Sequence, residues 1–129
     1  MSRKVIHSDS APKAIGPYSQ AIETRGTRTV YLSGQIALDS ATGQVVEGDV
    51  AAQTEKVMKN LEAVLVGAGM TFANVARCTI FLVDMNDFGK VNEVYGRYFP
   101  ANPPARATVA VAGLPRGVRV EIDAVAVGE

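Results

Sequence analysis

The sequence predicts an α+β fold in which two helices lie on one face of a mostly antiparallel sheet. Short segments rich in β-branched and aromatic residues recur along the chain, which is typical of strands. Two other stretches repeat apolar residues every three or four positions, which is typical of amphipathic helices. The length of 129 residues suits one domain, so we expect residues 1–129 to form a single unit.

The first third of the chain predicts strands and turns. Residues 4–7 form a short predicted strand, and the Gly-Pro-containing segment 16–20 predicts a turn that leads into the next one. Segments 21–24 and 29–36 flank a short connection that contains Gly26, which predicts a β-hairpin. Another turn is expected at 40–43.

The period of the pattern changes at Asp49, where a first helix is predicted to begin. Gly67 and Gly69 are expected to end this helix, because glycine accepts the left-handed conformation of a helix C-cap. The expected buried face consists of Val50, Thr54, Val57, Met58, Leu61, Val64 and Leu65. The polar residues expected to face away are Gln53, Glu55, Lys56, Lys59 and Glu62.

A strand is predicted over 76–85, followed by a second helix that opens at Asn86 and Asp87. The prolines of the 100–104 segment end this helix, since proline does not continue helical hydrogen bonding. Segments 106–113 and 118–127 are predicted strands joined through 114–117. The shared face of the second helix consists of Phe88, Val91, Val94, Tyr95 and Tyr98.

The strand over 76–85 is apolar on both faces. Cys78 and Ile80 point one way, while Phe81 and Val83 point the other. Two helices cover only one side of a sheet, so the second apolar face needs another cover. A further copy of the same chain is the simplest one, which predicts a homo-oligomer.

Composition excludes several classes of function. The chain has 13 basic and 13 acidic residues, so no net charge attracts nucleic acid or a membrane surface. One His and one Cys cannot build a typical zinc or transition-metal site, so we expect no metal. Neither a Walker A nor a G-x-G-x-x-G phosphate loop occurs, and we expect no cofactor. No signal-peptide core and no apolar run of membrane-spanning length is found, and the single Cys suits a reducing compartment, which predicts a cytoplasmic protein.

Two charged residues are candidates for chemistry. Glu121 lies in an otherwise apolar strand, where it is either a solvent-facing or ion-paired residue, for example with Arg119, or a partly buried base that orients water. Arg106 opens a strand directly after two prolines. Its planar guanidinium suits either the capture of a ligand carboxylate or an interface salt bridge.

Other residues allow both a structural and a functional interpretation. Tyr18 is either a surface aromatic or a hydroxyl donor over a pocket, and Ser33-Gly34 is either a strand end or part of a site. Cys78 is interpreted as core. Phe88 and Tyr95 are also interpreted as core, although Phe88, near the helix start, is a candidate pocket wall.

The motifs together resemble the RidA/YjgF family of deaminases in order and spacing, from the first predicted strand to the last. The stretch from Pro104 to Ile122 resembles the C-terminal signature of that family throughout. The matching segments are Ala14-Ile15-Gly16-Pro17-Tyr18-Ser19-Gln20, Leu32-Ser33-Gly34-Gln35-Ile36, Asn86-Asp87-Phe88 with Val91-Asn92, Pro104-Ala105-Arg106 and Val120-Glu121-Ile122.

The resemblance implies a chorismate-mutase-like fold and a homotrimer whose sheets pack into a central barrel, with ligand clefts between subunits. It also implies cofactor-free hydrolysis of 2-imino acids, such as 2-iminobutanoate and 2-aminoacrylate/2-iminopropanoate, to 2-keto acids and ammonia. Arg106 would hold the substrate carboxylate, Glu121 would position water, and Tyr18 of a neighbouring subunit would close the cleft. The further cleft positions implied are Ser33, Gly34, Asn92 and, as a wall, Phe88.

Two departures from the family pattern affect the cleft. Thr108 stands where the best-known members have Cys, so its hydroxyl would replace a thiol, and the 100–103 loop is shorter. Two other functions remain open: a non-enzymatic binder of 2-keto acids that uses the same cleft, and an endoribonuclease. The neutral charge and the lack of a His pair disfavour the latter.

Overall fold

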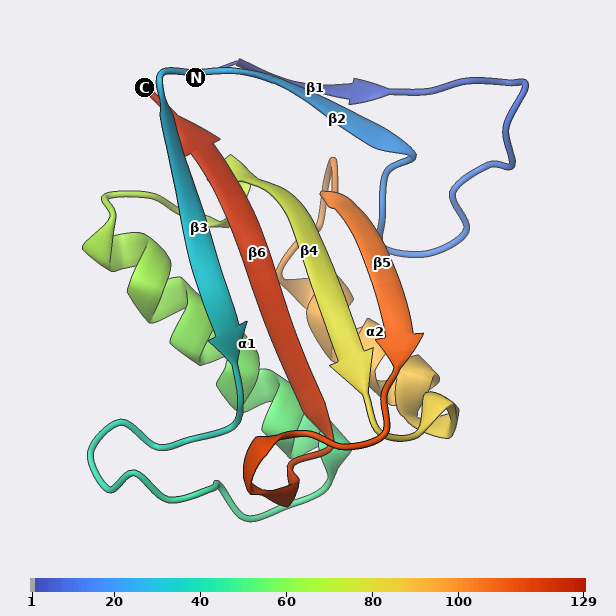
Figure 1. Ribbon diagram of the computed structural model, residues 1–129. Coiled ribbons are helices and arrows are strands. Elements are labelled where there is room, and N and C mark those ends of the chain that lie inside the picture. The colour runs from blue at the N-terminus through green and yellow to red at the C-terminus, as the bar shows by residue number, and fades with distance from the viewer. Residues whose placement is uncertain (1) are drawn as a thin grey trace.

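The computed structural model describes residues 2–129 and confirms an α+β architecture (Figure 1). A four-stranded sheet has the order β3 (Arg28–Gln35), β6 (Val120–Gly128), β4 (Val75–Leu82) and β5 (Ala105–Ala110). β6 is antiparallel to both of its neighbours, while β5 runs parallel to β4. The sheet is therefore mostly antiparallel, as the sequence predicts.

Helices α1 (Val50–Gly67) and α2 (Phe88–Arg97) lie on the same face of this sheet, also as predicted (Figure 1). The Asp49 side chain caps α1 by accepting a hydrogen bond from the Ala52 amide at 3.0 Å. Gly69 follows the helix end with a φ of +72°, in the left-handed region that favours glycine. The helices and the facing sides of β4 and β6 enclose the core.

Two residues of α1 differ from the predicted pattern. Gln53 is buried rather than exposed, because its side-chain oxygen accepts a hydrogen bond from the Arg119 amide at 2.8 Å. Its polar group is thus paired with the backbone just before β6. Val64, in contrast, is 41% exposed although it was expected on the buried face. The helix places it at the outer edge of the apolar stripe.

The predicted hairpin between the second and third strands is wrong. β2 (Ala21–Arg25) pairs with β1 (Ser2–Ile6) in a separate two-stranded antiparallel sheet, and β3 pairs with β6 instead. A Cβ atom at Gly26 would lie 2.6 Å from the carbonyl oxygen of Gly128. The glycine is therefore needed where the chain passes close to the end of β6, and not to form a hairpin turn.

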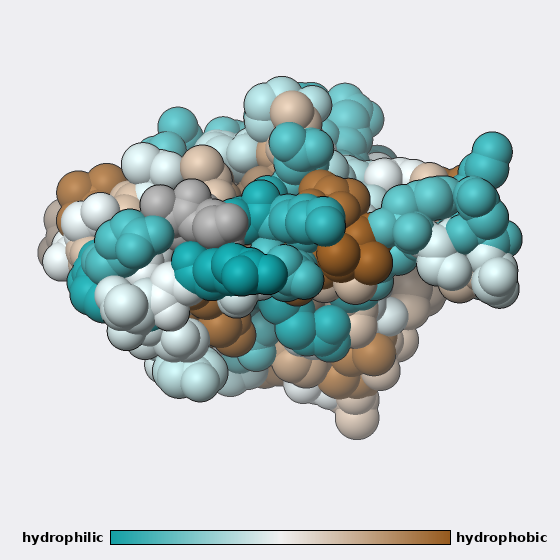
Figure 2. Space-filling view, turned by 90° about the horizontal axis from the view of Figure 1, so that it is seen from above, coloured by the Kyte–Doolittle hydropathy of each residue, from teal (hydrophilic) through white to brown (hydrophobic). Residues whose placement is uncertain are grey.

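No helix within residues 2–129 covers the face of the large sheet opposite α1 and α2 (Figure 1). Tyr31 and Val109 on this face are exposed, at 79% and 41%, and Phe81 and Val125 are half-buried. From the end where β1 and β2 lie, the surface is mostly hydrophilic, with small separate hydrophobic patches (Figure 2). None of the helices within residues 2–129 has the length and hydrophobicity of a membrane span.

Candidate functional site

Arg106 is the centre of a polar and aromatic cluster at the sheet edge. It lies on the outermost strand, β5, opposite Cys78 of β4, so its side chain points to the helix-covered face. Its Nη1 atom donates a hydrogen bond to Oδ1 of Asn92 on α2 at 2.5 Å. This bond fixes the orientation of the guanidinium, whose other N–H groups can still donate hydrogen bonds to a ligand.

Three aromatic rings surround the guanidinium. Its central carbon lies 5.3 Å, 5.5 Å and 5.3 Å from the ring centres of Tyr18, Phe88 and Tyr95, respectively. These distances fit cation–π interactions. Burial lowers the pKa of Arg106, although a guanidinium remains charged at neutral pH. A poorly hydrated, oriented cation of this kind is suited to a carboxylate, whose two oxygens match the planar fork.

The loop that carries Tyr18 is tied to the segment before Arg106. The Ser19 amide donates to the Pro104 carbonyl at 3.1 Å, and the Ser19 hydroxyl donates to the Pro103 carbonyl at 2.5 Å. These two bonds bring residues 18 and 106 of the same chain together. Tyr18 was expected to reach the cleft from a neighbouring subunit, whereas here its ring lies against Arg106 of its own chain.

Tyr95 is a member of the cluster that the sequence assigned only to the core. It is fully buried, yet its ring lies against Arg106. Burial, together with the neighbouring Cys78 thiol, raises the pKa of its hydroxyl above the ordinary value. The helical spacing of Phe88, Asn92 and Tyr95 puts all three on one face of α2, and this spacing was the signal available in the sequence.

Thr108 lies two residues after Arg106 on β5, on the same side of the strand. Its hydroxyl oxygen is buried and has no hydrogen-bond partner among residues 2–129. Buried hydroxyls are usually paired, so this one is available to a ligand or a water molecule beside Arg106.

Glu121, Ser33 and Gly34 form a second group, on the open face of the sheet. Glu121 lies opposite Phe81 of β4, whose side chain points away from the helices. The carboxylate of Glu121 lies against Gly34, where an added Cβ atom would overlap one of its oxygens. The pairing of β3 with β6 is irregular between Leu32 and Gln35, and this irregularity brings the Ser33-Gly34 segment to the carboxylate.

The alternative partner considered for Glu121 is engaged elsewhere. Arg119 donates from Nη2 to both carboxylate oxygens of Asp87, at 2.8 Å and 2.7 Å. Asp87 directly precedes α2, so this pair joins the start of β6 to the start of α2. Glu121 is therefore half-buried on the open face without Arg119 as its counter-ion.

The predicted site residues thus form two groups on opposite faces of one sheet. Arg106, Tyr18, Phe88, Asn92 and Thr108 belong to the helix-covered side. Glu121, Ser33 and Gly34 belong to the open side. Within one chain, a small ligand held by Arg106 does not reach Glu121, because the sheet separates the two groups.

Comparisons with known proteins extend over almost the whole chain. A family model described as "Endoribonuclease L-PSP" matches residues 8–128. "Protein DfrA" of Myxococcus xanthus is 64% identical over 127 residues, which cover 98% of this chain and 97% of that protein. The "2-iminobutanoate/2-iminopropanoate deaminase" of Mus musculus is 54% identical over 125 residues, covering 97% and 91% of the two chains.

A solved structure gives the same result for the fold. The crystal structure of YyfB from Yersinia pestis, described as a protein of unknown function of the conserved Rid family, aligns with a TM-score of 0.90 and 31% identity. The alignment covers 98% of this chain and 99% of that one.

Proposed function

The chain belongs to the RidA/YjgF family, and from this premise we propose that it hydrolyses 2-imino acids to 2-keto acids and ammonia. The observation that carries the proposal is the guanidinium of Arg106, held between Asn92 and three aromatic rings. This environment supports the capture of a small carboxylate. Relatives named for this activity, such as the mouse protein, support the choice of substrate class.

In the proposed reaction, Arg106 binds the carboxylate of the imino acid and fixes the position of its C2 atom. A protonated imine is already an electrophile, so water adds at C2 to give a carbinolamine. Glu121 accepts a proton from that water, and the nitrogen leaves as ammonia once it has received a proton. One imine and one water yield one keto acid and one ammonia, without a bond to the protein. The contribution of the protein is orientation.

We propose further that Glu121 reaches the cleft from a second copy of the chain. Arg106 and Glu121 face opposite sides of one sheet, so the reaction needs the carboxylate of a neighbour. The exposed Tyr31 and Val109 on the open face support self-association. A homotrimer with three shared clefts, in a chorismate-mutase-like barrel, is the assembly that we propose.

Ammonia release tests the reaction. A dehydratase generates 2-iminobutanoate or 2-iminopropanoate in situ, and ammonia release is followed with and without this protein. We expect acceleration by the wild type and little by Glu121→Gln, which keeps the shape of the side chain but loses the basic oxygen. Wild-type activity of the Glu121→Gln variant would assign Glu121 a structural role instead.

Mixing two inactive variants tests the shared cleft. In trimers assembled from equal amounts of Arg106→Ala and Glu121→Gln chains, about one cleft in four would combine an intact Arg106 with an intact Glu121 of its neighbour. We expect recovery of about a quarter of the wild-type activity. No recovery in trimers shown by light scattering to have formed would mean that both residues act within one chain, and finding only monomers would reject the assembly.

Two alternatives are outcomes of the same experiments. Binding of 2-oxobutanoate without acceleration of ammonia release would indicate a metabolite-binding protein. The description of the family model raises RNA cleavage as well. The net charge of zero and the exposed His7, paired with Asp9 at 2.9 Å, do not favour it. Cleavage of RNA by this protein that persists at moderate salt would support the endoribonuclease function. We also propose a cytoplasmic location, since one buried free Cys suits a reducing compartment.

A further inference from the structure

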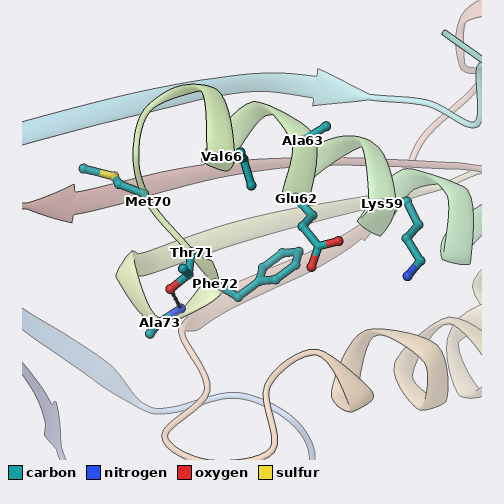
Figure 3. Close-up of a pocket in the computed structure, with 8 residues that line it drawn as sticks. All are labelled: Lys59, Glu62, Ala63, Val66, Met70, Thr71, Phe72 and Ala73. Carbon is teal, nitrogen blue, oxygen red and sulfur yellow. Dashed lines mark hydrogen bonds between the residues drawn. The ribbon is translucent and has the colours of Figure 1, made fainter.

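A cavity lies on the outer side of α1, apart from the residues of the proposed reaction. It has a volume of about 560 Å³ and runs between the helix and the segment 70–73 (Figure 3). Its wall is largely apolar, with two opposite charges. The lining residues are Lys59, Glu62, Ala63, Val66, Met70 and Phe72, together with Thr71 and Ala73. We call it the α1 groove.

The local structure makes the α1 groove a preformed feature. The residues that α1 contributes are spaced by three or four positions and therefore form one stripe along the helix. Thr71 and Asn74 form a reciprocal capping box that fixes the turn containing Phe72. The Phe72 ring packs against Tyr98 and Phe99, with ring centres 5.3 Å apart in each case. The floor of the groove is thus part of an aromatic cluster.

The charges of the α1 groove are available to a ligand. Lys59 and Glu62 project from the same side of α1, with Glu62 next to the Phe72 ring and Lys59 further along the helix (Figure 3). Lys59 lies over the Tyr98 ring with its Nζ atom 5.9 Å from the centre, and neither charge forms an ion pair within residues 2–129. Val66, one turn further along, is 66% exposed. A cation, an anion and an apolar surface therefore lie side by side.

We propose that the α1 groove binds an α-amino acid with an apolar side chain. The carboxylate of the amino acid would contact Lys59, its ammonium group would contact Glu62, and its side chain would cover Val66 and Phe72. Each exposed charge contributes little by itself, so a ligand needs both charges and the apolar contact to bind. This requirement favours the zwitterion over a simple amine or acid. The inference is independent of the proposed reaction, which uses neither Lys59 nor Glu62.

Titration of the full-length protein with L-phenylalanine, followed by NMR chemical shifts, tests the proposal. We expect shifts within residues 59–73, and weaker binding of L-phenylalaninamide and 3-phenylpropanoate, each of which lacks one of the two charges. Lys59→Met and Glu62→Gln should each weaken binding by about fivefold. Lys90→Met, which removes an exposed charge outside the α1 groove, should leave it unchanged.

A further variant tests whether the amino acid binds at Arg106 instead of in the α1 groove. Arg106→Gln removes the cation of the proposed reaction and should abolish ammonia release without affecting L-phenylalanine binding. Binding that is lost in Arg106→Gln and retained in Lys59→Met would place the amino acid at Arg106 and overturn the proposal. Equal affinity for all three probes, or no binding at millimolar concentration, would also overturn it.

Discussion

The carboxylate of Glu121 occupies the space in which a side chain at Gly34 would begin. Glycine at this position therefore determines where the carboxylate lies. The backbone of Gly34 is not in the left-handed region, so alanine is compatible with the fold and would act mainly by moving Glu121.

We expect Gly34→Ala to lower kcat/KM for imine hydrolysis by roughly tenfold or more, because displacement of the carboxylate disturbs the orientation of water. Activity assays and thermal unfolding of the same preparations check this. Gly113→Ala is the matched control, since a Cβ atom there meets nothing within 4 Å. Unchanged activity of the Gly34→Ala variant would mean that hydrolysis does not depend on the position of Glu121.

Arg106→Lys should be nearly as damaging as Arg106→Ala. Lysine keeps the charge but loses the planar fork that donates to Asn92 and orients a carboxylate. Loss of a bidentate charged contact costs about 1.5 to 3 kcal/mol, or one to two decades in kcat/KM. Arg97→Lys, at an exposed position on α2, is the control. An active Arg106→Lys trimer would reject the carboxylate clamp and favour an interface salt bridge.

Asp87→Asn should destabilise the protein, because it leaves Arg119 at the start of β6 without its counter-ion. The Asp87 side chain is 11% exposed and that of Arg119 is 44% exposed, so we expect a loss of about 1 to 3 kcal/mol in the free energy of unfolding. Glu93→Gln breaks the exposed pair with Arg97 and should cost less than about 0.5 kcal/mol. Urea unfolding of both variants measures the difference. Equal losses would show that burial adds nothing to the Asp87–Arg119 pair.

Stability should fall in alkaline solution through Cys78. Burial raises the pKa of this thiol to about 12, above the value of an exposed cysteine. The folded state holds the neutral thiol, so this contribution is complete below about pH 8.5 and is lost as the pH rises towards 12. Because the buried tyrosines titrate in the same range, the expectation concerns the difference: wild type should lose roughly 3 kcal/mol more than Cys78→Ala between pH 8 and pH 11. Parallel stability curves for wild type and variant would contradict the buried, protonated thiol.

The sequence predicted which segments are helices and strands better than it predicted how the strands pair. Local periodicity identifies a strand, and it also placed two helices on one face. Pairing depends on contacts between distant residues. The sequence around Gly26 predicts a hairpin turn. Glycine is instead required there because the backbone of Gly128, more than a hundred positions away in the sequence, passes close to it.

The candidate site was predicted in part for the same reason. Motif resemblance selected Arg106, Asn92 and Phe88, and the structure brings these three together. The alternation of side chains along one strand shows which of its residues share a face. To decide whether residues of two different strands share a face of the sheet, the register between the strands must also be known. The sequence therefore gave no indication that Arg106 and Glu121 point to opposite sides of the sheet.

The order of the strands has a consequence for biosynthesis. β6 is the last strand in the chain order, yet it lies in the middle of the sheet between β3 and β4. During translation, β3 and β4 emerge from the ribosome well before the strand that joins them. Before residues 120–128 are made, β4 can pair only with β5, and the edges of β3 and β4 that face β6 stay unpaired. The nascent chain therefore exposes two open strand edges, which favour aggregation, until the end of synthesis.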